Sequence, residues 1–95
     1  MRRDSMAADH GMIFPYPYSR PLTFWNHDVR FPLDLLFLDE GGIILSIQHM
    51  KAYDDTNTKE VTAEYVIELN AGTAGQLGLK EGDHLDIPAD AKVAP

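Results

Sequence analysis

Two short apolar runs joined by a glycine-containing turn constrain the fold of this sequence more than any other feature. Residues 33–38 (Leu-Asp-Leu-Leu-Phe-Leu) are almost continuously apolar, as is typical of a strand covered on both faces. The run ends at Asp39-Glu40-Gly41-Gly42, a composition typical of a tight turn, and residues 43–48 follow with a second apolar run. The pattern therefore predicts an antiparallel β-hairpin at the centre of the fold.

The rest of the sequence predicts further short strands. Residues 64–69 have the alternation of a strand whose two faces differ. Shorter β segments are expected in residues 12–14, the front of 22–31, and 84–87. Pro15, Pro17 and Pro21 follow the segment over residues 12–14, and a central strand does not tolerate proline. Residues 15–21 are therefore expected to form an extended loop.

One short helix is expected after residues 64–69. Asn70 is a suitable N-cap for a helix over residues 71–77, and Gly78 suits its left-handed stop. Six short strands and one such helix predict an all-β fold, either a small antiparallel β-sandwich or a partly open barrel. The length of 95 residues predicts a single domain over 1–95, with a core over 12–87 and a tail over 88–95.

Composition excludes several classes of function. The net charge is −7, and the eight Lys and Arg residues are scattered, so no basic stripe is available for nucleic acid or for an anionic membrane surface. The chain has no cysteine, which excludes disulfides, a thiolate nucleophile and Cys-ligated metal. No apolar run approaches the roughly 20 residues of a membrane span, and the start does not have the pattern of a signal peptide. The compartment stays open.

The segment Trp25-Asn26-His27-Asp28 has the highest density of functional side-chain types. On a strand, Trp25 and His27 share one face, while Asp28 lies on the other. An indole beside polar groups suits a cation or the face of a sugar ring. The plainer interpretation is that Trp25 belongs to the core and that the polar residues are a hydrated strand end.

Two carboxylates complete the candidate ligand-binding set. Asp34 interrupts an apolar run, so it must find hydrogen-bond donors; it is either a structural cap on the loop at Pro32 or an acid–base group near Asp28. Glu68 precedes the expected helix. It lies on a solvated face, forms a salt bridge to Arg30 or Lys80, or belongs to the rim of a groove. The candidate ligand-binding residues are therefore Trp25, His27, Asp28, Asp34 and Glu68.

The sequence gives no metal, cofactor or catalytic signature. The four histidines are His10, His27, His49 and His84. None of them forms a HxH or HxxxH pair, so no metal site is expected, although a remote His49 could join His27 and Asp28 if the fold brings them together. No GxSxG nucleophile motif occurs either. No cofactor and no catalytic residue is assigned.

Two functions of different classes remain. The first is a binding or interaction module for a small polar or glycan-like ligand, with the five candidate residues lining a groove. The alternative is a hydrolase-type enzyme that uses Asp28 and Asp34 as a carboxylate pair. We favour the binding module over the enzyme because no catalytic signature is present. An interaction subunit without a pocket is the third interpretation.

Three stretches resemble the bacterial family called domain of unknown function 192 (DUF192). They are residues 24–39 (Phe-Trp, then Pro-Leu-Asp-Leu-Leu-Phe-Leu-Asp), 65–74 (Tyr-Val-Ile-Glu-Leu-Asn-Ala-Gly-Thr-Ala) and 77–83 (Leu-Gly-Leu-Lys-Glu-Gly-Asp). The opening residues 2–14 also fit that family. The resemblance covers residues 2–87 and implies a compact β-sandwich-like fold. It implies no activity, because the function of the family is not established.

The sequence departs from the family pattern in two segments and at its beginning. Asn26-His27-Asp28 stands where the family usually has Met-Lys-Asn, and the loop at 50–63 lacks the usual prolines. Members of the family also usually have one more strand before the segment matched by Met1–Met6. Its absence is expected to expose a sheet edge, and we therefore expect a homodimer through such an edge.

Overall fold

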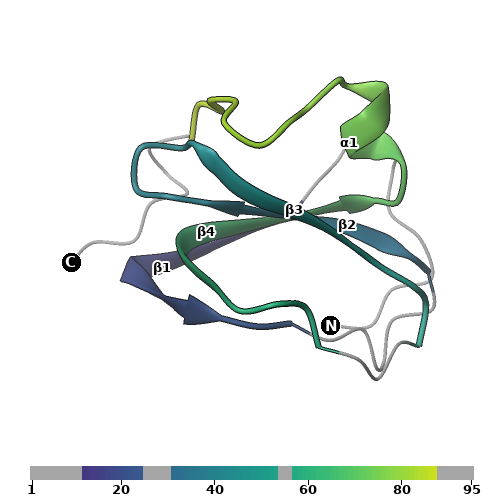
Figure 1. Cartoon of the computed structure of the whole chain (residues 1–95), viewed down its shortest axis with the longest axis horizontal. Coiled ribbons are helices and arrows are strands. Elements are labelled where there is room, and N and C mark those ends of the chain that lie inside the picture. The colour runs from purple at the N-terminus through teal and green to yellow at the C-terminus, as the bar shows by residue number, and fades with distance from the viewer. Residues whose placement is uncertain (1–11, 25–30, 54–56, 88–95) are drawn as a thin grey trace.

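The described part of the chain folds into one open antiparallel sheet with one short helix. The computed structural model describes residues 12–24, 31–53 and 57–87. Its strands are β1 (Met12–Leu22), β2 (Leu33–Leu38), β3 (Ile44–Met50) and β4 (Val61–Asn70), followed by helix α1 (Thr73–Gln76). The four strands are ordered β1-β4-β2-β3 (Figure 1). The predicted mostly-β class with one short helix is confirmed.

The central hairpin is formed as the sequence predicts. β2 pairs with β3 in antiparallel register from Leu33↔Met50 to Leu38↔Ile44. The turn is held by Asp39, whose carboxyl accepts the N–H groups of Gly41 and Ile43, each at 2.9 Å. β2 lies between β4 and β3, and all six of its residues are buried. β2 is therefore the central strand, while β3 lies at an edge of the sheet.

The expected loop over residues 15–21 is instead part of strand β1. This strand pairs only with β4, so it lies at the other edge of the sheet. Proline has no N–H group to donate, and an edge strand tolerates this because it has a hydrogen-bonded neighbour on one side only. The register is irregular between Pro15 and Arg20, which leaves Pro17 outside both paired stretches. The prediction was wrong because proline excludes a strand from the middle of a sheet, not from its edge.

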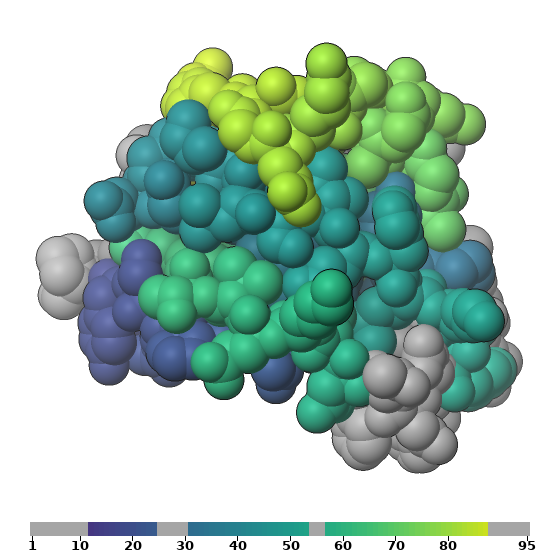
Figure 2. Space-filling model, viewed as in Figure 1, coloured from purple at the N-terminus to yellow at the C-terminus, as the bar shows by residue number. Residues whose placement is uncertain are grey.

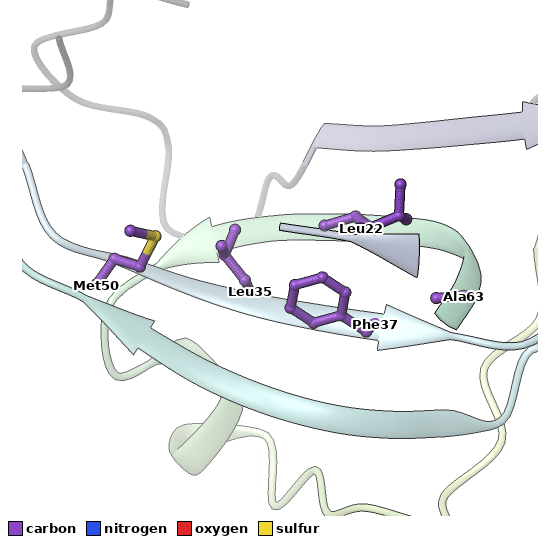
Figure 3. Packing of buried hydrophobic residues seen from close by; sticks show 6 residues of the cluster. Leu22, Leu35, Phe37, Met50 and Ala63 are labelled. Carbon is purple, nitrogen blue, oxygen red and sulfur yellow. The ribbon is translucent and has the colours of Figure 1, made fainter. Parts of the chain in front are cut away.

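Both faces of the sheet are covered with apolar side chains. One buried cluster surrounds Phe37 and includes Leu22, Leu35, Met50, Ala63 and Val66 (Figure 3). The other surrounds Leu36 on the opposite face and includes Leu38, Ile44, Tyr65 and Ile67. Helix α1 and residues 77–87 lie over this second face (Figures 1 and 2). Because successive residues of a strand point to opposite faces, β2 contributes to both clusters.

The C-terminal part of the fold differs from the prediction in two details. The strand expected over 84–87 is reduced to one bridge, between Ile43 and His84. The helix has four residues, and its N-cap is Gly72 with a φ of 89°, not Asn70. The N–H groups at this helix start donate to Asp34 on β2 instead. A side chain distant in sequence therefore replaces the expected local cap.

Gly42 fixes the approach of residues 82–85 to the hairpin turn, and we expect substitution here to be costly. Its φ is +84°, and an added Cβ would lie 2.3 Å from the carbonyl oxygen of Leu85. Gly42→Ala should lower the free energy of unfolding by about 2–4 kcal/mol, through backbone strain and displacement of this contact. Urea unfolding would measure the loss. The matched control is Gly41→Ala, whose Cβ would meet only Asp39 at 3.5 Å; equal losses at the two glycines would contradict the explanation.

Candidate functional site

Asp34 is the most buried ionisable side chain on the face that carries α1. Its relative exposure is 0%. Its Oδ2 accepts the N–H groups of Gly72 at 3.0 Å and Ala74 at 3.1 Å. Its Oδ1 lies 2.6 Å from Nδ1 of His49. Both oxygens are thus engaged, one with the start of α1 and the other with an imidazole on β3.

Strand register brings these groups together. Asp34 lies directly opposite His49 in the β2–β3 pair and opposite Leu69 in the β2–β4 pair. Directly opposed residues of antiparallel strands point to the same face, so the turn at residues 39–42 sets the Asp34–His49 contact. β4 ends at Asn70, directly after Leu69. The chain then turns back over Asp34 and begins α1.

His49 is held at one ring nitrogen and exposed over most of its surface. Its side chain is 72% exposed, whereas that of Asp34 is buried. Because a carboxylate accepts hydrogen bonds, we assign the proton of the neutral ring to Nδ1, which leaves the lone pair on Nε2. The ring is therefore oriented by a buried partner and can offer Nε2 to a ligand. The same arrangement can accept a proton from a bound hydroxyl group.

An apolar hollow lies on the same face of the sheet, at the side of Leu69. Its volume is about 280 Å³, and all its lining residues are aliphatic. The sheet contributes Ile13, Leu36, Ile67 and Leu69, and the covering segment contributes Leu77, Leu79 and Leu85. A cavity of this lining offers no hydrogen bonds from side chains, whereas His49 on the same face of the sheet can form them.

Comparison with known families identifies the chain. The profile of the DUF192 family, described as an uncharacterized ACR, matches residues 1–87. The chain belongs to this family. Two solved structures are similar to the DUF192 chain. One, from Sinorhizobium meliloti, is described as a candidate transcription regulator; it is 37% identical with a TM-score of 0.84, over 88% of this chain and 67% of that one.

The second similar structure is a protein of unknown function from Novosphingobium aromaticivorans. It is 30% identical to the DUF192 chain with a TM-score of 0.83, over 90% of this chain and 62% of that one. The chain thus spans about two thirds of the length of either protein. No curated protein matches the sequence.

The structure separates the residues that the sequence proposed for one groove. Trp25, His27 and Asp28 lie outside the described residues. Asp34 and Glu68 lie on opposite faces of the DUF192 sheet: Asp34 is opposite Leu69, whereas Glu68 is opposite Leu35 and Met12. Glu68 is 2% exposed, so it is not on a solvated face. The two carboxylates therefore do not share a site.

His49 is the site residue that the sequence alone does not predict. The sequence offers it only as a remote metal ligand, yet it is the direct partner of Asp34. The predicted hairpin contains a signal for this pairing. Asp34 and His49 lie at nearly equal distances along the chain from the turn, and they become directly opposite once the one-residue register shift in β3 is included. Asp34 does act as a cap, but on the start of α1 and not on the loop at Pro32.

The described part of this DUF192 chain has neither a cluster of metal-ligand side chains nor a membrane-spanning helix. Within residues 12–24, 31–53 and 57–87, no group of three or more His, Cys, Asp or Glu side chains is placed to hold a metal ion. In the same ranges, no helix has the length and apolar character that spanning a bilayer requires. Asp34 and His49 form the candidate site.

Proposed function

We propose that this DUF192 domain is a binding module for a small polar, glycan-like ligand, and that His49 is its contact residue. The observation that carries the proposal is the 2.6 Å contact between Oδ1 of buried Asp34 and Nδ1 of exposed His49. A ring that is already oriented loses less conformational entropy when it binds a ligand. Its Nε2 suits the hydroxyl groups of a sugar or another polyol, which donate hydrogen bonds.

The net charge of the chain bears on the charge of its ligand. Because the chain carries a net charge of −7, it favours a neutral or cationic ligand over a polyanion. Nucleic-acid phosphates require clustered Lys and Arg, and this sequence scatters them, so direct nucleic-acid binding is not part of the proposal. The description of the Sinorhizobium meliloti protein as a candidate regulator is compatible with a domain that senses a small molecule.

The Asp34–His49 pair also favours a second candidate function. A carboxylate bonded to Nδ1 of a histidine is the orienting half of the acid–base machinery in many hydrolases. In this alternative, His49 is a general base and Asp34 is a positioning residue. A pair of Asp28 and Asp34 has less support, because Asp34 has no exposed surface and both its oxygens are engaged. No described serine or threonine hydroxyl bonds to His49, so binding is the first candidate.

The imidazole nitrogens can test the binding proposal directly. We expect a panel of neutral mono- and disaccharides to shift the Nε2 resonance of His49 saturably in long-range proton–nitrogen NMR spectra. His49→Asn should weaken this binding by about tenfold or more, because one hydrogen bond and the ordered ring are lost. His84→Asn is the matched control, since His84 is also exposed and also lies near an aspartate, Asp86 at 3.7 Å.

The outcomes separate the two functions. Saturable shifts that are lost only in His49→Asn support binding. The absence of saturable shifts across the panel, or equal shifts in His49→Asn and the parent protein, would overturn the proposal. Turnover of nitrophenyl esters or glycosides that His49→Asn abolishes and His84→Asn leaves intact would favour the enzyme instead.

A further inference from the structure

We propose that the outer edge of β3 pairs with the same edge of a second copy of this chain, in antiparallel orientation around a two-fold axis. This interaction surface uses the backbone edge of β3, whereas the proposed ligand contact is the side-chain Nε2 of His49 on the same strand. The inference begins from the two outermost strands of the sheet in the described part of the chain, β1 and β3. Unprotected edges recruit further strands, so proteins usually block them with proline, charge or a bulge.

The two edges differ sharply in protection. β1 contains Pro15, Pro17 and Pro21 and includes the cation of Arg20. The register is irregular in both edge strands, between Pro15 and Arg20 in β1 and at Leu45 in β3, so it does not distinguish them. β3, with the sequence ILSIQHM, contains no proline and no Asp, Glu, Lys or Arg. This is notable in a chain of which 24% is charged. β3 also exposes Leu45, whose relative exposure is 39%.

Hydrogen-bond alternation shows which backbone groups of β3 point outward. Asp39, which continues β2, donates its N–H to Ile43 across the turn. Alternate residues of a strand bond to the same side, so the odd-numbered residues of β2 bond toward β3. Their partners in the register are Ser46, Gln48 and Met50. The N–H and C=O groups of Ile47 and His49 therefore point away from β2.

The start of this outer edge is already occupied within the chain. Ile44 donates its N–H to Asp83 at 2.8 Å, and its carbonyl accepts the N–H of Gly82 at 2.8 Å. The described residues place no such backbone partner on Ile47 or His49. Among residues 12–24, 31–53 and 57–87, the part of the edge without a backbone partner is thus the short stretch over residues 45–49.

A second copy fits this stretch better than a charged partner. In antiparallel pairing about a two-fold axis at Ile47, that residue lies opposite the partner's Ile47, and His49 lies opposite the partner's Leu45. The exposed Leu45 is thereby covered. Two chains of charge −7 repel each other over most of their surfaces, but residues 45–49 themselves contain no carboxylate; Asp83 lies beside Ile44, at the start of this stretch. Because β3 contains no Asp, Glu, Lys or Arg, we expect two copies of the chain to meet at this strand rather than at β1.

The test uses light scattering coupled to size exclusion on the full chain over a range of micromolar concentrations. We expect the parent protein to be a dimer. Leu45→Lys, which puts like charges near the two-fold axis, should raise the dimer dissociation constant by about 100-fold. Ser19→Lys places the same charge on the exposed, proline-rich edge of β1 and should leave the dimer intact. Circular dichroism establishes that both variants are folded.

Amide hydrogen exchange gives an independent readout. The Ile47 and His49 amides should exchange more slowly as the concentration of the parent protein rises, and this protection should be lost in Leu45→Lys. A parent protein that stays monomeric with rapid exchange at both amides would overturn the proposal and leave the edge to a strand of a different protein. Equal weakening by Leu45→Lys and Ser19→Lys would also overturn it, because the dimer would then use another surface.

Discussion

Replacing Asp34 with alanine is expected to lower the free energy of unfolding by about 3–5 kcal/mol. The substitution removes the acceptor of two backbone N–H groups, at Gly72 and Ala74, and the partner of the His49 ring. Asp34 is fully buried, so water cannot take over these bonds without opening the start of α1. Urea unfolding followed by circular dichroism measures the loss.

Two matched variants separate burial from hydrogen bonding. Asp39 also accepts two backbone N–H groups, but it is only partly buried, so Asp39→Ala should cost about 1 kcal/mol. Asp34→Asn keeps one acceptor oxygen and should cost less than Asp34→Ala. Its amide N–H₂ would face Nδ1 of His49, so the neutral ring should move its proton to Nε2. An Asp34→Ala protein within 1 kcal/mol of the parent would show that α1 does not depend on this carboxylate.

Replacing Phe37 with alanine is expected to cost about 3–5 kcal/mol, the range for a buried aromatic side chain. Phe37 is 0% exposed and lies at the centre of its cluster on the central strand. Its ring also meets Phe24 edge to face, with centroids 6.0 Å apart. Truncation would leave a cavity that the flanking strands cannot close, because β2 is paired on both sides. Thermal and urea unfolding would report the loss.

Two control variants test whether the loss of stability comes from the buried volume of the Phe37 ring. Phe37→Leu retains most of the buried volume and should cost about 1–2 kcal/mol. Leu77→Ala removes an aliphatic group from a site that is 65% exposed, and it should cost less than about 1 kcal/mol. If Phe37→Ala and Leu77→Ala destabilised the protein equally, burial in the cluster would not be the source of the effect.

The elements that the sequence predicts well are those that depend on neighbouring residues. The β2–β3 hairpin follows from two apolar runs and from the turn that Asp39 and Gly42 close. The prolines of β1 were misinterpreted because an edge position depends on the order of strands, which is not a local property. The short helix was placed correctly between Asn70 and Gly78, but its cap comes from a residue 38 positions earlier than Gly72.

The candidate site shows the same limit. An aspartate inside an apolar run predicts a buried carboxylate that needs donors, and Asp34 confirms this expectation. Identifying His49 as its partner requires the strand register, including the irregularity between Phe37 and Leu38. Separating Glu68 from Asp34 requires knowledge of which face each strand residue occupies. Residue types alone do not contain this information.

Because β4 lies between β1 and β2 in space but follows both in sequence, the ribosome releases β1 and β2 long before the strand that joins them. The β2–β3 hairpin can form as soon as residues 33–50 have emerged, but β4 ends only at Asn70. At a synthesis rate of about 5–20 residues per second, the interval is about 1–4 s. During that time β2 has one open edge and uncovered apolar side chains, which are the features that chaperones recognise on nascent chains.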